Sequence, residues 1–284
     1  MKNSKAHTRT LYRHGLPMRI THWANALCLF FLLLSGLQIF NAHPHLYWGS
    51  VSDFDSPWLS MGAHRTEAGE MVGHTRLFGW ELNTTGVLGL SSDANGDPQV
   101  RGFPSWLTIP SGRWLAMGRN WHFFFAWLLV INASLFFVWA VASGHLKKLI
   151  PTREDWRSFG SSVISHIKLQ HPAGEEATRY NILQKLAYLI TIFGLGALIV
   201  ITGLCMSPRM DTVMGGVLEV LGGRQSARSI HFLIACSFVL FVFVHLFEVV
   251  VTGPLNNLRS MITGNFRYQT DTPDKHEKES HHDG

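Results

Sequence analysis

The chain has 284 residues, of which 46% are hydrophobic and only 15% are charged, and its formal net charge is +5. Soluble globular proteins carry about 25% charged residues, so this composition argues against an ordinary soluble domain. No stretch resembles a nucleic-acid-binding module, and we attribute the positive charge to membrane topology instead.

Four apolar windows are long enough to cross a bilayer, whose hydrocarbon core takes about 20 helical residues. They are Trp23–Phe40, Trp121–Ala142, Leu186–Leu204 and Ile230–Val251, and Glu248 is the one residue among them that is Asp, Glu, Lys or Arg. We therefore predict an all-α fold: one membrane domain over 1–284, built as a four-helix bundle. Its expected parts are spans at about 18–40, 120–143, 184–206 and 228–252, a long structured periplasmic loop at 41–119, and a cytoplasmic tail at 253–284.

The flanks of these windows predict the orientation of the chain. Lys and Arg are dense in residues 1–19 and 144–185, whereas 41–119 holds five arginines over nearly twice the length of the second range. By the positive-inside rule, both termini are cytoplasmic in a bacterial inner membrane. The first window is too long for a signal peptide and lacks a small-x-small cleavage signal before Asn41, so we expect it to be retained.

Cysteine does not predict a metal centre. Cys28, Cys205 and Cys236 are isolated, and the chain has neither a CxxC nor a CxxCH motif. Small apolar packing is the ordinary role of such residues. A metal centre in this chain would have to depend on histidine.

Two histidines, His231 and His245, lie 14 residues apart in the fourth window. Fourteen residues rise roughly 21 Å along a helix and return to nearly the same face. Histidine is costly inside a membrane and usually marks a functional site there. His122, at the start of the second span, matches His231 in depth, and His22, at the start of the first, matches His245.

These four histidines form two height-matched pairs, and a haem iron takes two axial imidazoles from opposite sides. The spacing therefore predicts two haem b groups held non-covalently, one by His22 and His245 and one by His122 and His231. His145 is the alternative ligand on the cytoplasmic side. Because Lys147 and Lys148 follow it, we interpret it as an interfacial anchor.

The 41–119 loop is too long for an ordinary connection between neighbouring helices. It carries a His-Pro-His sequence at 43–45, which is weak evidence for a surface metal site. It also contains six Tyr and Trp residues, which indicate an ordered docking surface: Tyr47, Trp48, Trp58, Trp80, Trp106 and Trp114. A second outer piece, Thr212–Leu221, is expected to be a short amphipathic helix.

Several stretches resemble the bacterial cytochrome b561 family, which includes the membrane cytochrome b subunits of nickel–iron hydrogenase, formate dehydrogenase and thiosulfate reductase. They are Arg19-Ile20-Thr21-His22-Trp23, Arg119-Asn120-Trp121-His122, Tyr180-Asn181-Ile182-Leu183-Gln184-Lys185, Thr202-Gly203-Leu204, Arg228-Ser229-Ile230-His231-Phe232 and Val244-His245. The resemblance implies the same four haem ligands: His22, His122, His231 and His245.

The resemblance further implies a quinone site beside the inner haem, with Asn181 and Gln184 contributing and Lys185 and Tyr188 nearby. Asn181 as a helix cap is the alternative. It also implies a periplasmic partner, by analogy a molybdopterin oxidoreductase of the sulfite-oxidase type. The expected function is then electron relay between that enzyme and the membrane quinone pool.

Three alternatives remain open at the level of sequence. The chain could be a stand-alone quinol-dependent oxidase of a small periplasmic oxidant such as superoxide, which would leave the aromatic loop unexplained. It could be a membrane anchor or transporter without haem. It could also bind a single haem as a sensor or assembly factor.

Overall fold

The computed structural model describes residues 7–168 and 181–270. Tyr180 and the part of the expected tail beyond residue 270 lie outside these ranges. Four helices are long and apolar enough to cross a membrane: Leu16–Phe40, Leu115–Ala142, Ile182–Cys205 and Arg224–Val251. Each begins a few residues before the span predicted for it and ends within one residue of it, so the predicted positions agree with the structure.

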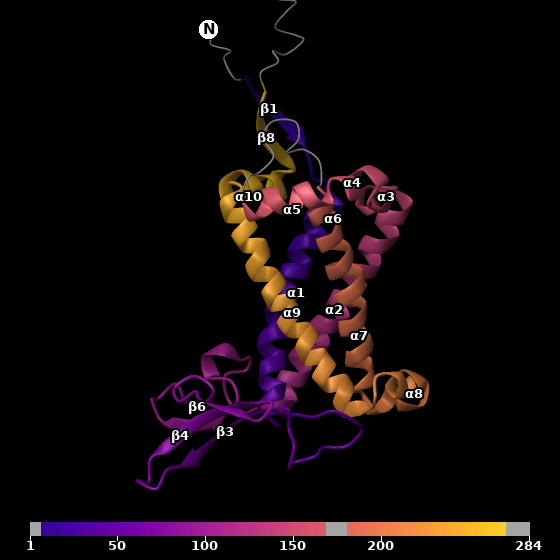
Figure 1. Cartoon of the computed structure of the whole chain (residues 1–284). Helices are drawn as coiled ribbons and strands as arrows, with labels where there is room; N and C mark the ends of the chain where they lie inside the picture. The colour runs from indigo at the N-terminus through magenta and orange to yellow at the C-terminus, as the bar shows by residue number, and fades with distance from the viewer. Residues whose placement is uncertain (1–6, 169–180, 271–284) are drawn as a thin grey trace, which may run out of the picture. The chain divides into compact units, whose positions relative to one another are not determined.

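Three of these long helices are continuous. They are α1 (Leu16–Phe40), α2 (Leu115–Ala142) and α9 (Arg224–Val251), labelled in Figure 1. The remaining one is divided, because a π-helical stretch interrupts its α-helical geometry. Its parts are α6 (Ile182–Tyr188), the π-helix η3 (Leu189–Leu195) and α7 (Gly196–Cys205).

Shorter helices lie between and after the long ones. The second outer piece is α8 (Asp211–Val220), which confirms the helix expected at 212–221. The others are α3 (His145–Leu149), α4 (Arg153–Arg157), α5 (Phe159–Ile167), α10 (Pro254–Thr263) and the 3-10 turns η1 (Ser105–Leu107) and η4 (Pro208–Met210).

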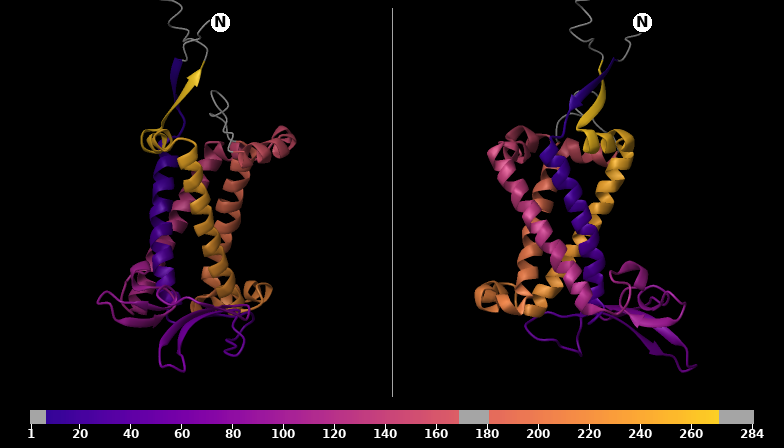
Figure 2. Two further views of the ribbon diagram at one scale, coloured as in Figure 1. Left: turned by 60° about the vertical axis from the view of Figure 1, so that its left-hand side comes forward. Right: turned by 180° about the vertical axis from the view of Figure 1, so that it is seen from behind.

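The expectation of an all-α chain is incomplete, because the 41–119 segment contains antiparallel sheet. One four-stranded sheet has the order β2 (His45–Leu46), β3 (Leu59–Arg65), β4 (Met71–Leu77), β5 (Trp80–Asn83). A separate hairpin pairs β6 (Gly89–Ser92) with β7 (Pro98–Arg101). Elsewhere β1 (His7–Tyr12) pairs with β8 (Asn265–Thr270) as the two-stranded ribbon visible in Figure 2.

The turn between β4 and β5 explains how this segment can form a sheet without alternating apolar residues. Phe78 and Gly79 both have positive φ, at 49° and 85°. Two such residues make the turn type that matches the twist of adjacent strands. The Phe-Gly pair indicates a hairpin turn. The flanking residues are too polar to show the apolar alternation that predicts strands, so the hairpin was not predicted.

The chain divides into two compact units, which we describe separately. The first comprises Met1–Trp23, Leu135–Gly194 and Val239–Gly284, and the second comprises Ala24–Ser134 and Leu195–Phe238. Both units draw on α1, α2 and α9, so each contains parts of several long helices. The whole 41–119 segment belongs to the second unit.

In the second unit a small apolar core joins the sheet to the helix ends. Buried Phe40, at the end of α1, packs with buried Leu46, Trp58, Leu59 and Met61 of the segment. Hydrogen bonds complete the attachment, since Trp58 Nε1 donates to Ser229 Oγ of α9 at 2.9 Å. The aromatics therefore include internal anchors as well as surface groups.

Arg101 is the buried polar centre of this attachment, with 4% of its surface exposed. Its Nη2 donates to Gln38 Oε1 of α1 and to Thr108 Oγ1, both at 2.9 Å. Its Nη1 donates to the Ser111 carbonyl oxygen at 2.9 Å. One guanidinium therefore connects β7, α1 and the 105–112 stretch, which orders the segment against the membrane helix.

We expect Arg101→Ala to loosen the 41–119 segment, because it leaves the buried acceptors of Gln38 and Thr108 without this donor, a loss of roughly 2–4 kcal/mol. Limited trypsin digestion and thermal unfolding of the detergent-solubilised protein measure the effect. Arg65→Ala is the control, since exposed Arg65 makes a hydrogen bond only to the Gly69 carbonyl among the contacts described. Equal digestion rates for the two variants would contradict the structural role of Arg101.

Candidate functional site

In the first unit, His22 of α1 and His245 of α9 face each other. Their ring centroids are 6.2 Å apart and their planes are inclined at 55°. Phe241 stacks on His245 with a centroid distance of 5.8 Å, and Trp23 meets the His22 ring edge-on at 5.3 Å. The buried Nδ1 of His22 has no hydrogen-bond partner among the residues described.

In the second unit, His122 of α2 and His231 of α9 form a second pair with nearly the same geometry. Their ring centroids are 6.3 Å apart and their planes are inclined at 60°. The structure thus brings together both of the pairs that depth in the sequence suggested. Helix α9 contributes one imidazole to each.

Two buried hydroxyls orient the rings of the second pair. His122 Nδ1 lies 3.1 Å from Ser35 Oγ of α1, and His231 Nδ1 lies 3.0 Å from Thr202 Oγ1 of α7. Both hydroxyls also donate to the carbonyl oxygen one turn earlier in their own helix, at 2.6 and 2.7 Å. A hydroxyl has a single proton to donate, so each oxygen accepts from the imidazole Nδ1–H. The Nε2 atoms are then left unprotonated and available as ligands.

A glycine follows each of these hydroxyl residues and lies against the same ring. A Cβ atom added at Gly36 would be 3.4 Å from His122 Cε1, and one added at Gly203 would be 3.4 Å from His231 Cε1. A larger side chain at either position would press on the imidazole. The tripeptides Ser35-Gly36-Leu37 and Thr202-Gly203-Leu204 therefore perform matching roles on two different helices.

Two of these four positions escaped the sequence analysis. Thr202 and Gly203 appeared there only within a stretch of family resemblance, and Ser35 and Gly36 were not singled out. The repeated hydroxyl-glycine-leucine tripeptide in two apolar spans was the signal that could have found them.

His145 does not join either pair. It begins α3, and its ring lies 5.2 Å from Trp139 at the end of α2. Glu248, one turn beyond His245, meets His166 of α5, with Nε2 and Oε1 3.2 Å apart. The sequence analysis had no partner for Glu248, because His166 lies 82 positions earlier in the chain.

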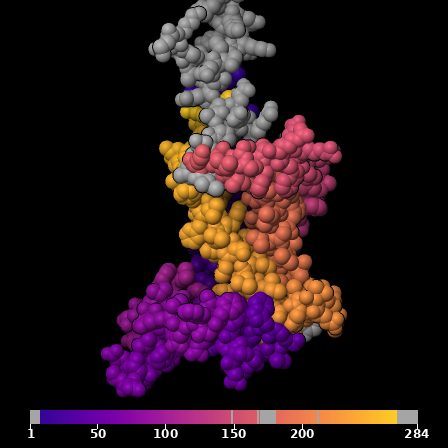
Figure 3. Space-filling view, viewed as in Figure 1, coloured from indigo at the N-terminus to yellow at the C-terminus, as the bar shows by residue number. Residues whose placement is uncertain are grey.

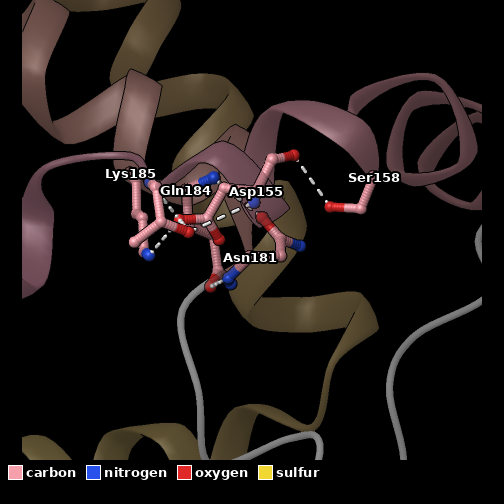
Figure 4. Close-up of polar contacts among 6 residues, drawn as sticks. Asp155, Ser158, Asn181, Gln184 and Lys185 are labelled. Carbon is pink, nitrogen blue, oxygen red and sulfur yellow. Dashed lines mark hydrogen bonds and ion pairs between the residues drawn. The ribbon is translucent and has the colours of Figure 1, made fainter.

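Asn181 and Gln184 lie together at the start of α6, where they form a reciprocal cap (Figure 4). Asn181 Oδ1 accepts from the Gln184 backbone N–H at 2.8 Å, and Gln184 Oε1 accepts from the Asn181 N–H at 3.3 Å. The helix-cap role considered for Asn181 is therefore present. Only the amide oxygens take part in these two contacts, and neither NH₂ group has a hydrogen-bond partner among the residues described.

Lys185 also has a structural partner, because its Nζ donates to Asp155 Oδ2 of α4 at 2.6 Å. Both side chains are largely buried, with 13% and 18% exposed. The same carboxylate oxygen accepts from the Thr152 backbone N–H, which caps α4. The Lys185 ammonium is the main cause that holds the pKa of Asp155 below its usual value.

The model of a known family, described as prokaryotic cytochrome b561, matches residues 13–264. The chain belongs to this family. Cytochromes of the b561 family bind haem b, so the chain is a membrane haem b electron-transfer subunit, and its four apolar helices place it in the bacterial inner membrane.

Among curated proteins, the chain is similar to a candidate protein-methionine-sulfoxide reductase subunit, YedZ1, from Azospira oryzae. The two are 32% identical over 160 residues, which cover 55% of this chain and 75% of the relative. No solved structure matches the chain. The resemblance to the b561 family drawn from the motifs is confirmed.

We expect Asp155→Asn to weaken the contact between α4 and α6 by about 1 kcal/mol at neutral pH, since a charge-assisted bond is replaced by a neutral one. Because the folded-state pKa of Asp155 is lowered, the stabilisation is complete above the ordinary aspartate pKa and is lost as the pH falls through the lowered value. Thermal unfolding measured from pH 7 to pH 3 tests this. The gap between wild type and variant should narrow as the pH falls below the ordinary aspartate pKa, whereas exposed Glu154→Gln should show no gap; a gap that stays the same from pH 7 to pH 3 would contradict it.

Proposed function

We propose that the chain carries two b haems and relays electrons between a periplasmic oxidoreductase and the membrane quinone pool. The observation that carries this proposal is the pair of imidazole separations, 6.2 and 6.3 Å between ring centroids. Two imidazoles that share one metal through bonds of about 2 Å have ring centres roughly 6 Å apart. The separation is too large for ring stacking and suits one shared iron.

The surroundings of the rings fit a haem as well. His122 and His231 direct Nε2 away from Ser35 and Thr202, and a hydrogen bond at the opposite ring nitrogen fixes the orientation of a metal-ligating histidine. Gly36 and Gly203 keep the ring edges free of side chains. The unpartnered Nδ1 of His22 has no such support, so the two centres are held differently.

In this proposal His22 and His245 hold the inner haem, and His122 and His231 hold the outer one. Bis-imidazole haem supplies one-electron transfer when bound. The protein provides the ligands, the orientation of the rings and an apolar surrounding that excludes water. The Lys and Arg distribution supports cytoplasmic termini, with the 41–119 segment in the periplasm.

Each single ligand replacement should remove one haem of two. We expect His22→Ala or His245→Ala, and equally His122→Ala or His231→Ala, to lower the haem-to-protein ratio from about two to about one, because a lost axial imidazole releases a non-covalent haem. A pyridine haemochrome assay gives the ratio, and the haem that is retained reports correct folding. His145→Ala is the matched control and should keep both. A wild-type ratio near one, or four variants that keep two haems, would contradict the proposal.

The quinone site is proposed at the start of α6, where the Asn181 and Gln184 NH₂ groups would donate to a quinone carbonyl. Tyr188 lies one turn further along α6. The Glu248–His166 contact, one turn from His245, offers a carboxylate and an imidazole for the protons that accompany quinone reduction or quinol oxidation.

Variants that keep the helix cap of α6 separate quinone binding from the capping role of the two amides. Asn181→Asp and Gln184→Glu keep the cap oxygens and remove the NH₂ donors, so α6 stays intact while a quinone would lose a hydrogen bond. We expect about tenfold slower haem reduction by a quinol analogue in stopped-flow measurements, as about 1.4 kcal/mol implies. Wild-type rates in both variants would leave the two amides as a helix cap alone.

The 41–119 segment is proposed as the docking surface for the periplasmic enzyme. It is ordered by Arg101 and still exposes several large aromatics, a pattern typical of protein interfaces. The most exposed are Phe54 at 72%, Phe78 at 67%, Trp80 at 80% and Trp106 at 73%. A stand-alone oxidase of superoxide would leave them without a role.

The relative's description as a reductase subunit supports an oxidoreductase as the partner. By the family resemblance, we propose a molybdopterin enzyme of the sulfite-oxidase type. A dehydrogenase of this kind would send electrons to quinone, and a reductase would draw them from quinol.

A further inference from the structure

Three neighbouring strands of the 41–119 sheet place metal-ligating side chains on one face. In the antiparallel register, Gly62 of β3 lies opposite His74 of β4, and His74 lies opposite Asn83 of β5. His64 follows Gly62 by two residues, and Glu81 precedes Asn83 by two. Because side chains alternate along a strand, His64, His74 and Glu81 all project from the same face.

The three side chains are close enough to share one ion. His64 Nδ1 and His74 Nδ1 are 3.3 Å apart. One ligand atom from each of His64, His74 and Glu81 can be chosen so that all three lie within 4.8 Å of one another. Two ligands of a tetrahedral metal with bonds of about 2 Å are roughly 3.3 Å apart, which is the separation of the two imidazole nitrogens.

Local packing favours this arrangement. Gly62 has no side chain, and a Cβ atom there would lie 3.4 Å from His74 Cε1, so the glycine gives the imidazole room over the sheet. Arg76 Nη2 binds Glu81 Oε2 at 2.7 Å. The other carboxylate oxygen of Glu81 makes no hydrogen bond among the residues described, and it remains available while Arg76 holds the side chain in place.

We propose that His64, His74 and Glu81 bind one divalent transition-metal ion of the zinc and copper class. Two imidazoles and one carboxylate suit such ions, and three protein ligands leave a fourth position open to water. The site lies on the 41–119 segment, purple in the space-filling view of Figure 3, next to exposed Trp80. It is separate from both histidine pairs, so it can be tested without reference to haem.

The alternative is an ordinary hydrogen bond between the two imidazoles, in which one Nδ1 donates to the other. That arrangement needs no metal and gives Glu81 no part. The two cases differ in their response to added metal and to the loss of the carboxylate.

The test uses the full-length protein in detergent, without an affinity tag and freed of metal by a chelator, titrated with Zn²⁺ by calorimetry. We expect one site with a micromolar or tighter Kd, at least 100-fold weaker in His64→Ala and His74→Ala and about 10-fold weaker in Glu81→Gln. Glu70→Gln, on the β3–β4 turn, and His276→Ala, in the tail, are matched controls that should titrate like wild type.

Cu²⁺ added in a second series reports the ligands directly, since its electron paramagnetic resonance spectrum should show nitrogen coupling that either histidine variant alters. The thermal unfolding curve serves as the folding control for every variant. The proposal is overturned if the histidine variants bind Zn²⁺ as wild type does, or if wild type binds it only at millimolar concentration.

Discussion

An imidazole inside an apolar helix has two nitrogen atoms that need partners, and a bilayer interior offers no water to either. An unpaired polar group in such surroundings costs several kcal/mol. In the second unit this constraint is met by Ser35 and Thr202, whose buried hydroxyls accept from the Nδ1–H groups of His122 and His231. In the proposed haem site, a shared iron would satisfy the remaining nitrogen of each ring.

Helix α9 links His231 to the 41–119 segment within the second unit. The turn before His231 carries Arg228 and Ser229, and both bind the 41–119 segment. Arg228 donates to the carbonyl oxygens of His43 and His45, at 2.5 and 3.0 Å, and Ser229 Oγ donates to that of Tyr47 at 2.6 Å. The residues next to a candidate haem ligand therefore also hold the segment on which a partner would dock.

Arg19, Arg119 and Arg228 each lie three residues before a candidate haem ligand. The Arg228 guanidinium binds backbone carbonyls, and that of Arg19 binds the Ile262 carbonyl of α10. Arg119 lies over the Phe123 ring at 5.7 Å. Each arginine thus has a protein partner, and the case for cofactor binding depends on the two imidazole pairs.

Local properties of the chain made much of this predictable. Span length depends on a run of apolar residues, and depth along a helix follows from its constant rise, so the four spans and the two histidine pairs could be inferred from residue numbers. The helix at 212–221 and the possible cap at Asn181 could be predicted for the same reason, since both depend on a few consecutive residues.

Other features depended on contacts between residues far apart in the chain. Ser35 reaches His122 across 87 positions, and Glu248 finds His166 across 82. The sheet in 41–119 arises because buried Arg101 and the Phe40 core hold weakly patterned strands together, and its register alone brings His64, His74 and Glu81 to one face. The sequence by itself determined which helices form and how deep each histidine lies, because helical geometry is local. Only the tertiary structure decided which side chains complete each site, because that depends on how separate segments pack.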